Sequence, residues 1–104
     1  METINNSEVL KNSISEGNTC LKFSAEWCGP CRVMGETIAS IEGDYPNINF
    51  IEVDVDEADE ELVSKYKIRN IPVLFFIKNG EVLSKEIGAM SVDVLKEKIN
   101  EYYG

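Results

Sequence analysis

Histidine is absent from this chain of 104 residues. Its absence excludes histidine-based catalytic triads, imidazole proton relays and histidine-ligated metal sites. Only three cysteines are present, Cys20, Cys28 and Cys31, an odd number that does not suggest a secreted disulfide scaffold. Three thiols without histidine are also too few for a four-ligand zinc site in one chain. We therefore expect neither a metal site nor a bound cofactor.

Positive charge is scarce as well. Ten basic side chains stand against 19 acidic ones, which gives a net charge of −9. The sequence has no cluster of basic residues that could attract phosphate groups, so nucleic acid is not an expected partner. The longest apolar run, Ile71–Ile77, is too short to span a bilayer. The first ten residues lack the basic and apolar segments of a signal peptide, and we expect a monomeric cytoplasmic protein with no membrane contact.

The length and composition fit one folded domain, residues 1–104. A single hydrophobic core usually covers about 50–200 residues, and 43% hydrophobic with 28% charged residues is typical of a soluble globule. No internal repeat, low-complexity stretch or linker divides the chain.

Hydrophobic periodicity predicts helices and strands in alternation. Asn6 and Ser91 precede amphipathic segments as helix N-caps, and Asn79-Gly80 is a typical two-residue hairpin turn. The pattern predicts helices at 7–17, at 31–42 with Gly43 as the stop, at 56–66 and from 92 onward, and strands at 19–25, 48–55, 73–77 and 81–87. A βαβ half followed by a ββα half implies an α/β fold, with a central mixed β-sheet flanked by helices on both faces.

The segment Trp27-Cys28-Gly29-Pro30-Cys31 joins a predicted strand to a predicted helix. Two cysteines at i and i+3 in a first helical turn lie on one face, close enough to form a disulfide. Cys28 would lie at the helix start, where free N–H groups and the helix dipole favour a thiolate. Cys31 would lie one turn deeper and be less exposed. We expect Gly29 to permit the tight approach and Pro30 to preset the backbone of the first turn.

These positions predict a dithiol-disulfide cycle. The Cys28 thiolate would attack a substrate disulfide, and Cys31 would then resolve the mixed disulfide and release the reduced substrate. Two alternatives stay open. A purely structural disulfide is disfavoured because so short a loop removes little entropy from the unfolded state, and half a zinc site would need ligands from a second chain.

Four motifs, in this order and spacing, resemble the thioredoxin family over essentially the whole chain: WCGPC, Ile71-Pro72, Lys78-Asn79-Gly80 and Gly88-Ala89. The resemblance implies a thioredoxin fold and a protein-disulfide reductase that acts on disulfide-containing client proteins. It also implies that a thioredoxin reductase using NADPH or ferredoxin recharges the protein, and that the only redox centre is the Cys28-Cys31 pair.

The resemblance further implies that Ile71-Pro72 is a cis peptide bond facing the two cysteines. Substrate would dock on a flat apolar patch around Cys28, formed by Trp27, Ile71, Val73, Gly88 and Ala89, with Pro72 in the same loop. Alternatives remain for single members. Trp27 could be a rim or core aromatic, and Gly88 could relieve a bulge at the strand end. We expect Cys20, within a strand, to be an inert packed thiol, with a regulatory thiol as the alternative.

The chain departs from the family at a buried charge. Most thioredoxins carry a carboxylate six residues before the first active-site cysteine, where this sequence has Lys22, and the neighbouring strand's usual lysine is replaced by Glu52. We predict a Lys22–Glu52 ion pair behind Cys31, because a buried charge needs its partner. As catalytic candidates, Glu52 would take the Cys31 proton, or Lys22 would stabilise a thiolate. Alternatively, Lys22 extends to solvent at the strand end and has no chemical role.

Three other functions remain open. One is disulfide oxidase activity, which the lack of an export signal disfavours. The chain could be a binding or chaperone module that uses the apolar patch, with the cysteines incidental. It could also be a specialised thioredoxin-like protein with one dedicated partner.

Overall fold

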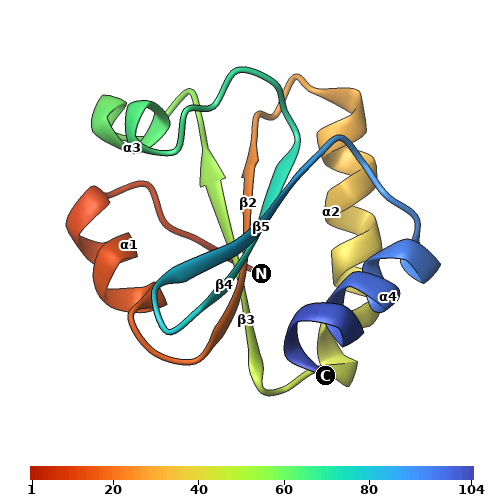
Figure 1. Ribbon diagram of the computed structural model, residues 1–104. Coiled ribbons are helices and arrows are strands. Elements are labelled where there is room, and N and C mark those ends of the chain that lie inside the picture. Colours follow the sequence, from red (N-terminus) through yellow and green to blue (C-terminus); the bar gives the residue numbers. More distant parts are fainter.

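Five strands form one mixed sheet, in the order β1-β3-β2-β4-β5, in the computed structural model, which describes residues 1–104 (Figure 1). Parallel pairing joins β3 to β1 and to β2, and antiparallel pairing joins β4 to β2 and to β5. The strands are β1 (Glu2–Thr3), β2 (Asn18–Ser24), β3 (Ile48–Asp54), β4 (Val73–Lys78) and β5 (Glu81–Ile87). The predicted α/β mixed sheet is confirmed.

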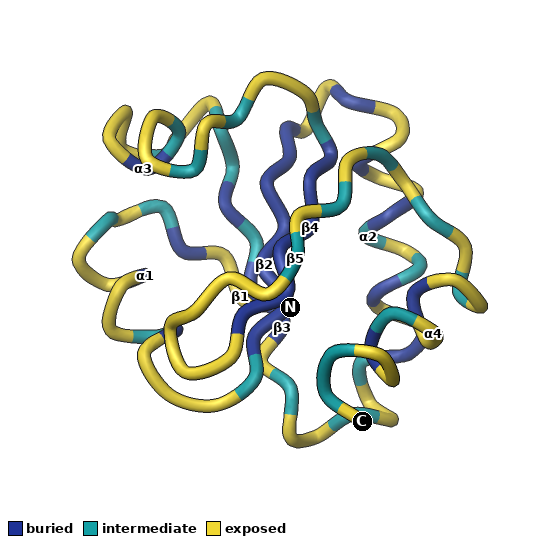
Figure 2. The backbone as a smooth tube through the Cα atoms, in the orientation of Figure 1, coloured by how far each residue is buried: buried dark blue, intermediate teal, exposed yellow.

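Helices cover both faces of this sheet. The helices are α1 (Ser7–Ile14), α2 (Gly29–Ile41), α3 (Glu60–Lys65) and α4 (Val92–Tyr103). Helices α1 and α3 lie on one face and α2 and α4 on the other (Figure 1). Each face has its own core, one containing Leu10 and Leu62, the other Met34 and Leu95. The central strands β2 and β4 are buried on both sides (Figure 2), which explains the nearly continuous apolar sequence of β4.

Local signals place the helix starts and the hairpin. The side chains of Asn6 and Ser91 accept the backbone N–H of Val9 and Val94 at 3.0 and 3.2 Å, as N-caps do. Asn79 and Gly80 have φ values of 50° and 81°, the left-handed pair that a tight hairpin turn requires.

Four predicted boundaries were wrong. Helix α1 ends at Ile14 rather than near residue 17. Helix α2 begins at Gly29, not at residue 31, and it continues into a 3-10 turn, η1 (Glu42–Asp44), so Gly43 does not stop it. Helix α3 begins at Glu60, because the backbone N–H groups of Glu57 and Ala58 bond to Asp54 in a turn. Strand β1 was not predicted at all. None of the helices has both the length and the apolar character that crossing a membrane would require.

Candidate active site at the start of α2

Two sulfurs meet where β2 ends and α2 begins, at the top of Figure 1. Cys28 is the N-cap of α2, and its Sγ accepts the backbone N–H of Cys31 at 3.2 Å. Cys28 and Cys31 form a disulfide, with their Cα atoms 5.2 Å apart. The helix start therefore holds the Cys28 sulfur against a free backbone donor and the positive end of the helix dipole, which favours a negatively charged sulfur.

The two cysteines differ in depth as predicted. Cys28 is 6% exposed and Cys31 is 1% exposed, so the first sulfur is the more accessible of two largely covered ones. Gly29 and Pro30 form the exposed first turn of α2. Apart from its two chain neighbours and the nearby backbone of α2, no atom lies within 4 Å of a Cβ built on Gly29. The role of Gly29 in the tight turn between the cysteines stays a prediction.

The loop before β4 lies against the disulfide. Ile71-Pro72 is a cis peptide bond, and the Ile71 carbonyl oxygen lies 3.9 Å from the Cys28 Sγ. Pro72 is buried, and its carbonyl accepts the Gly88 N–H at 2.8 Å. Gly88 has a φ of 95°, a backbone conformation that disfavours other residues. Gly88 thus has a structural role beside the loop.

Apolar side chains surround the disulfide, with one correction. Trp27 is 68% exposed, and its indole N–H donates to an Asp56 carboxylate oxygen at 2.8 Å. Ile71 is half-buried and Ala89 is exposed. Val73, in contrast, is 1% exposed and packs in the core, so its side chain cannot belong to the docking patch. It was misassigned because adjacent strand residues alternate between faces.

Lys22 and Glu52 form the predicted ion pair. They face each other in the register of β2 and β3, and the Lys22 Nζ donates to a Glu52 carboxylate oxygen at 3.1 Å. Lys22 is 3% exposed and Glu52 is 26% exposed. Lys22 therefore does not extend to solvent, and the interpretation of it as a surface lysine is wrong.

A cavity of about 300 Å³ connects this ion pair to the deeper cysteine, with Lys22, Glu52, Cys31 and Gly35 in its wall. A Cβ built on Gly35 would lie 3.2 Å from the Lys22 Nζ. Gly35 of α2 thus leaves room for the lysine ammonium, and Glu52 is the member of the pair nearer to solvent.

Cys20 lies apart from this site, in the core between the sheet and α4. Burial raises the pKa of its thiol to about 12, against the smaller opposing effect of a hydrogen bond with Tyr103. The thiol is buried and unpaired, as expected. Across residues 1–104, no group of three or more His, Cys, Asp or Glu side chains is placed to hold a metal ion.

Sequence reasoning missed three residues near the site: Asp56, Gly35 as the lysine's neighbour, and Ile87. Ile87 is 63% exposed and ends β5 directly before Gly88. The sequence did contain a signal for Ile87, because an isoleucine next to the Gly88-Ala89 motif continues the predicted apolar patch. Asp56 and Gly35 carried no such signal, because their partners lie far away in the sequence.

Comparison with known proteins finds the same family throughout. The thioredoxin family model matches residues 2–101. The chain is 36% identical over 98 residues to a thioredoxin of Mycoplasmoides gallisepticum, covering 93% of this chain and 97% of that protein. It is 37% identical over 102 residues to a thioredoxin of Oryza sativa subsp. japonica, covering 93% and 77%. The solved structure of Plasmodium falciparum thioredoxin superposes with a TM-score of 0.89 at 30% identity, covering 98% of this chain and 99% of that one.

Proposed function

This chain belongs to the thioredoxin family and is a thiol-disulfide oxidoreductase that reduces protein disulfides; from that premise we propose that Cys28 attacks the substrate and Cys31 resolves. The observation that carries this assignment is the hydrogen bond from the Cys31 N–H to the Cys28 Sγ at the start of α2. Only the first sulfur of the pair receives this stabilisation as an anion.

The cycle then runs in two exchanges. The Cys28 thiolate attacks a disulfide sulfur of the client, the client S–S bond breaks, and one client sulfur leaves as a thiolate that takes up a proton. The Cys31 thiol loses its proton and attacks the Cys28 Sγ, which releases the second client sulfur. The client gains two electrons, and the protein is left with the Cys28–Cys31 disulfide that the structure contains.

Docking uses the apolar residues around the disulfide, namely the exposed Trp27, Ala89 and additional Ile87 and the half-buried Ile71. Gly88 and Pro72 hold the neighbouring backbone in place. An extended client segment would lie along the Ile71 carbonyl, which already faces the Cys28 sulfur. Aromatic and aliphatic side chains in this arrangement supply contact area without charge selectivity, which suits a reductase with several clients.

Glu52 accepts the proton that Cys31 must lose, across the cavity that both residues line. A lysine ammonium has no free electron pair, so Lys22 cannot take this proton while it is charged. Lys22 instead acts as a positioning residue, holding the Glu52 carboxylate through their ion pair. The charges are exchanged between strands relative to most of the family, yet a carboxylate remains beside the deeper thiol.

We place this cycle in the cytoplasm of the cell, where the protein would work as a monomer, a single domain over residues 1–104. A dithiol reductant works only where its disulfide is continually returned to the reduced state. Thioredoxin reductase drawing on NADPH or ferredoxin would supply these electrons. The partners would be disulfide-containing client proteins, and neither membranes nor nucleic acids would be among them.

Insulin reduction driven by dithiothreitol tests the assignment. We expect Cys28→Ser to abolish the acceleration. We expect Cys31→Ser to accumulate a mixed disulfide with insulin, visible by mass spectrometry without reductant. Cys20→Ala is the matched control and keeps the wild-type rate, because Cys20 lies in the separate core. A Cys28→Ser protein that still reduces insulin would contradict the proposal; one that binds clients normally without turnover would show a separable binding function.

A further inference from the structure

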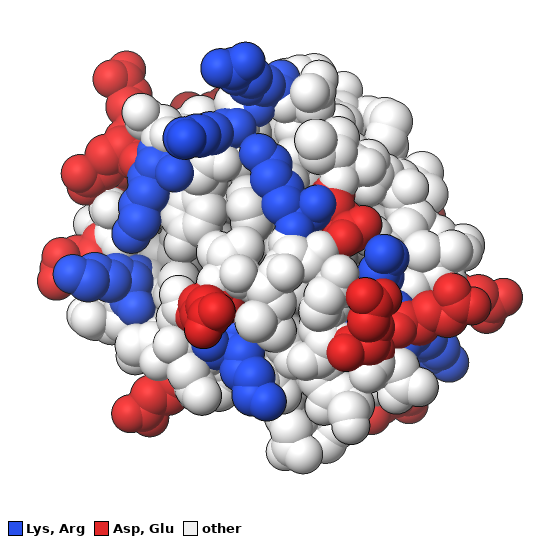
Figure 3. Space-filling view, in the orientation of Figure 1, with Lys and Arg blue, Asp and Glu red and all other residues white.

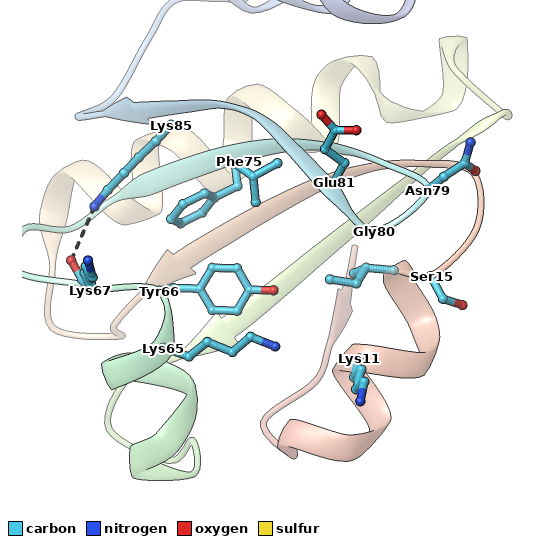
Figure 4. Close-up of a pocket in the computed structure, with 12 residues that line it drawn as sticks. Lys11, Ser15, Lys65, Tyr66, Lys67, Phe75, Asn79, Gly80, Glu81 and Lys85 are labelled. Atoms are coloured by element: carbon cyan, nitrogen blue, oxygen red, sulfur yellow. Dashed lines mark hydrogen bonds between the residues drawn. The ribbon is translucent and has the colours of Figure 1, made fainter.

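The fold gathers positive charge around one hollow, away from the disulfide. Four of the ten basic residues line it: Lys11 of α1, Lys65 and Lys67 at the end of α3, and Lys85 of β5. The hollow has a volume of about 750 Å³. Basic side chains border it in the space-filling view (Figure 3), and the close-up shows lysines from the separate elements arranged around it (Figure 4).

These lysines lack acidic partners. The three ion pairs of the structure are Met1–Glu42, Lys22–Glu52 and Lys98–Glu86, and none includes a lysine of the hollow. Only Glu81 contributes a carboxylate to the lining. In a molecule with 19 acidic side chains and a net charge of −9, a cluster of four unpaired cations is an attractive site for an external anion.

The interior of the hollow is apolar and aromatic. Tyr66 and Phe75 lie in its wall with their ring centroids 5.2 Å apart, and the Tyr66 hydroxyl points into the open space (Figure 4). The ammonium of Lys65 lies 5.8 Å from the Tyr66 ring centre and that of Lys85 lies 5.7 Å from the Phe75 ring centre. The geometry therefore places ring surface and positive charge within the length of one small molecule.

We propose that this hollow binds a small aromatic polyanion, of the chemical class of a nucleoside diphosphate. The four ammonium groups share the lining with a single carboxylate, that of Glu81, so a matching ligand carries several negative charges. Lysines bind phosphates well as point charges. Phe75 is buried, so the half-buried Tyr66 supplies the ring surface that suits a planar ring, whereas a long acyl chain would need an enclosed tunnel. The volume lies within the range of about 300–1,000 Å³ that is typical of small-molecule sites.

The frame of the hollow is fixed independently of the redox site. The Asn79 side chain accepts the Gly17 N–H at 2.8 Å, and the Asn79 N–H donates to the Gly17 carbonyl at 2.9 Å, so the β4–β5 turn is tied to the loop after α1. The Lys85 ammonium also donates to the Lys67 carbonyl at 3.3 Å, which joins β5 to the end of α3. Binding there does not require the disulfide to change state.

Titration of the full-length, isotope-labelled protein by NMR tests the proposal with three probes. ADP carries both ring and charge, pyrophosphate carries charge alone, and adenosine carries the ring alone. We expect ADP to bind more tightly than either fragment and to shift the backbone amides of residues 65–67 and 80–85. The double variant Lys65→Gln/Lys85→Gln should weaken ADP binding by about tenfold, the size expected for losing two solvent-exposed ionic contacts.

The double variant Lys78→Gln/Lys96→Gln is the matched control. Both residues are exposed and outside the hollow, and the net charge changes equally. This control should bind ADP as the wild type does, and all variants should reduce insulin at the wild-type rate. Three results would each overturn the proposal: no ADP-dependent shifts in the hollow, pyrophosphate binding as tight as ADP, or equal weakening in the two double variants.

Discussion

At the scale of single residues, Glu52 is the side chain whose removal tests the proposed proton transfer. We expect Glu52→Gln to slow insulin reduction severalfold at neutral pH and to change the shape of the pH–rate profile, because the amide cannot accept the Cys31 proton. The rate is measured between about pH 6 and 9, where thiol exchange responds to thiolate supply.

Glu36→Gln is the control for that substitution. Glu36 lies on the exposed side of the same helix that carries Cys31, and its loss changes the net charge equally. Its pH–rate profile should match that of the wild type. Superimposable profiles for Glu52→Gln and the wild type would show that Glu52 takes no part in the exchange.

Cys20 should be silent towards thiol reagents in the folded protein. It is buried, and its pKa is raised to about 12 by burial, so almost no thiolate is present at neutral pH. In the variant Cys28→Ser/Cys31→Ser, where Cys20 is the only thiol, iodoacetamide should label nothing in native buffer and everything in denaturant. Labelling of the native variant on the timescale of the wild-type Cys28 reaction would refute this.

Residue-level prediction succeeded where one side chain dictated its partner. A lysine within a buried strand demands a nearby carboxylate, and the resemblance to the thioredoxin family placed that carboxylate at Glu52. It failed for Val73, because a surface patch inferred from a loop motif ignores which face of the strand each residue occupies.

At the scale of elements, the signals that predicted boundaries correctly were local. The side chains of Asn6 and Ser91 accept backbone N–H groups three residues away, and the hairpin turn depends on the left-handed φ values of Asn79 and Gly80 themselves. Their sequence context is therefore sufficient. Strand β1 has no such context. Its residues Glu2 and Thr3 have exposed side chains, and its partner is the distant strand β3. Two exposed residues show no hydrophobic alternation, so no pattern could have found them.

Helix α2 provides a prediction about stability. Replacing glycine by alanine inside a helix normally stabilises a protein by about 0.4–1 kcal/mol. At Gly35 the new Cβ would lie 3.2 Å from the buried Lys22 ammonium, which must shift while keeping its ion pair. We therefore expect Gly35→Ala to gain nothing, or to lose up to about 1 kcal/mol, in urea unfolding.

Gly43→Ala is the comparison for that experiment. Gly43 lies in η1, its φ is not positive, and a Cβ there meets nothing within 4 Å. This variant should show the ordinary gain of a few tenths of a kcal/mol or more. Equal gains at both glycines would mean that the lysine moves freely and that Gly35 is not needed to accommodate it.

At the scale of the whole molecule, chemistry that depends on one short segment was predictable and surfaces assembled from distant segments were not. The Cys28–Cys31 pair is contained in one turn of helix. The lysine-lined hollow draws Lys11 from α1 and Lys85 from β5, which no linear charge pattern brings together. The expectation of no basic cluster holds for the sequence and fails for the folded surface.

The folded molecule should lose stability in alkaline solution through its buried acids. Burial raises the pKa of Cys20 from 9.0 to about 12 and raises the pKa of Tyr103 and of Tyr66 above the value of 10.0. The folded state thus holds these protons more tightly than the unfolded chain does. The stability that these protonated groups give the folded state is complete below about pH 9 and is lost progressively as the pH rises towards 12. Urea midpoints at about pH 7, 9 and 11 measure the decline.

Repulsion within a molecule of net charge −9 could also weaken it at high pH, and two variants separate the causes. Tyr103→Phe removes a hydroxyl that shares its one proton between the Thr19 and Ile77 carbonyls and accepts the Ile77 N–H. The substitution should therefore lower stability by about 1–3 kcal/mol at neutral pH. It should nevertheless flatten the alkaline decline, because one buried acid is gone. Cys20→Ala should flatten it as well, with a smaller neutral-pH loss. Declines as steep as that of the wild type in both variants would assign the alkaline sensitivity to surface charge instead.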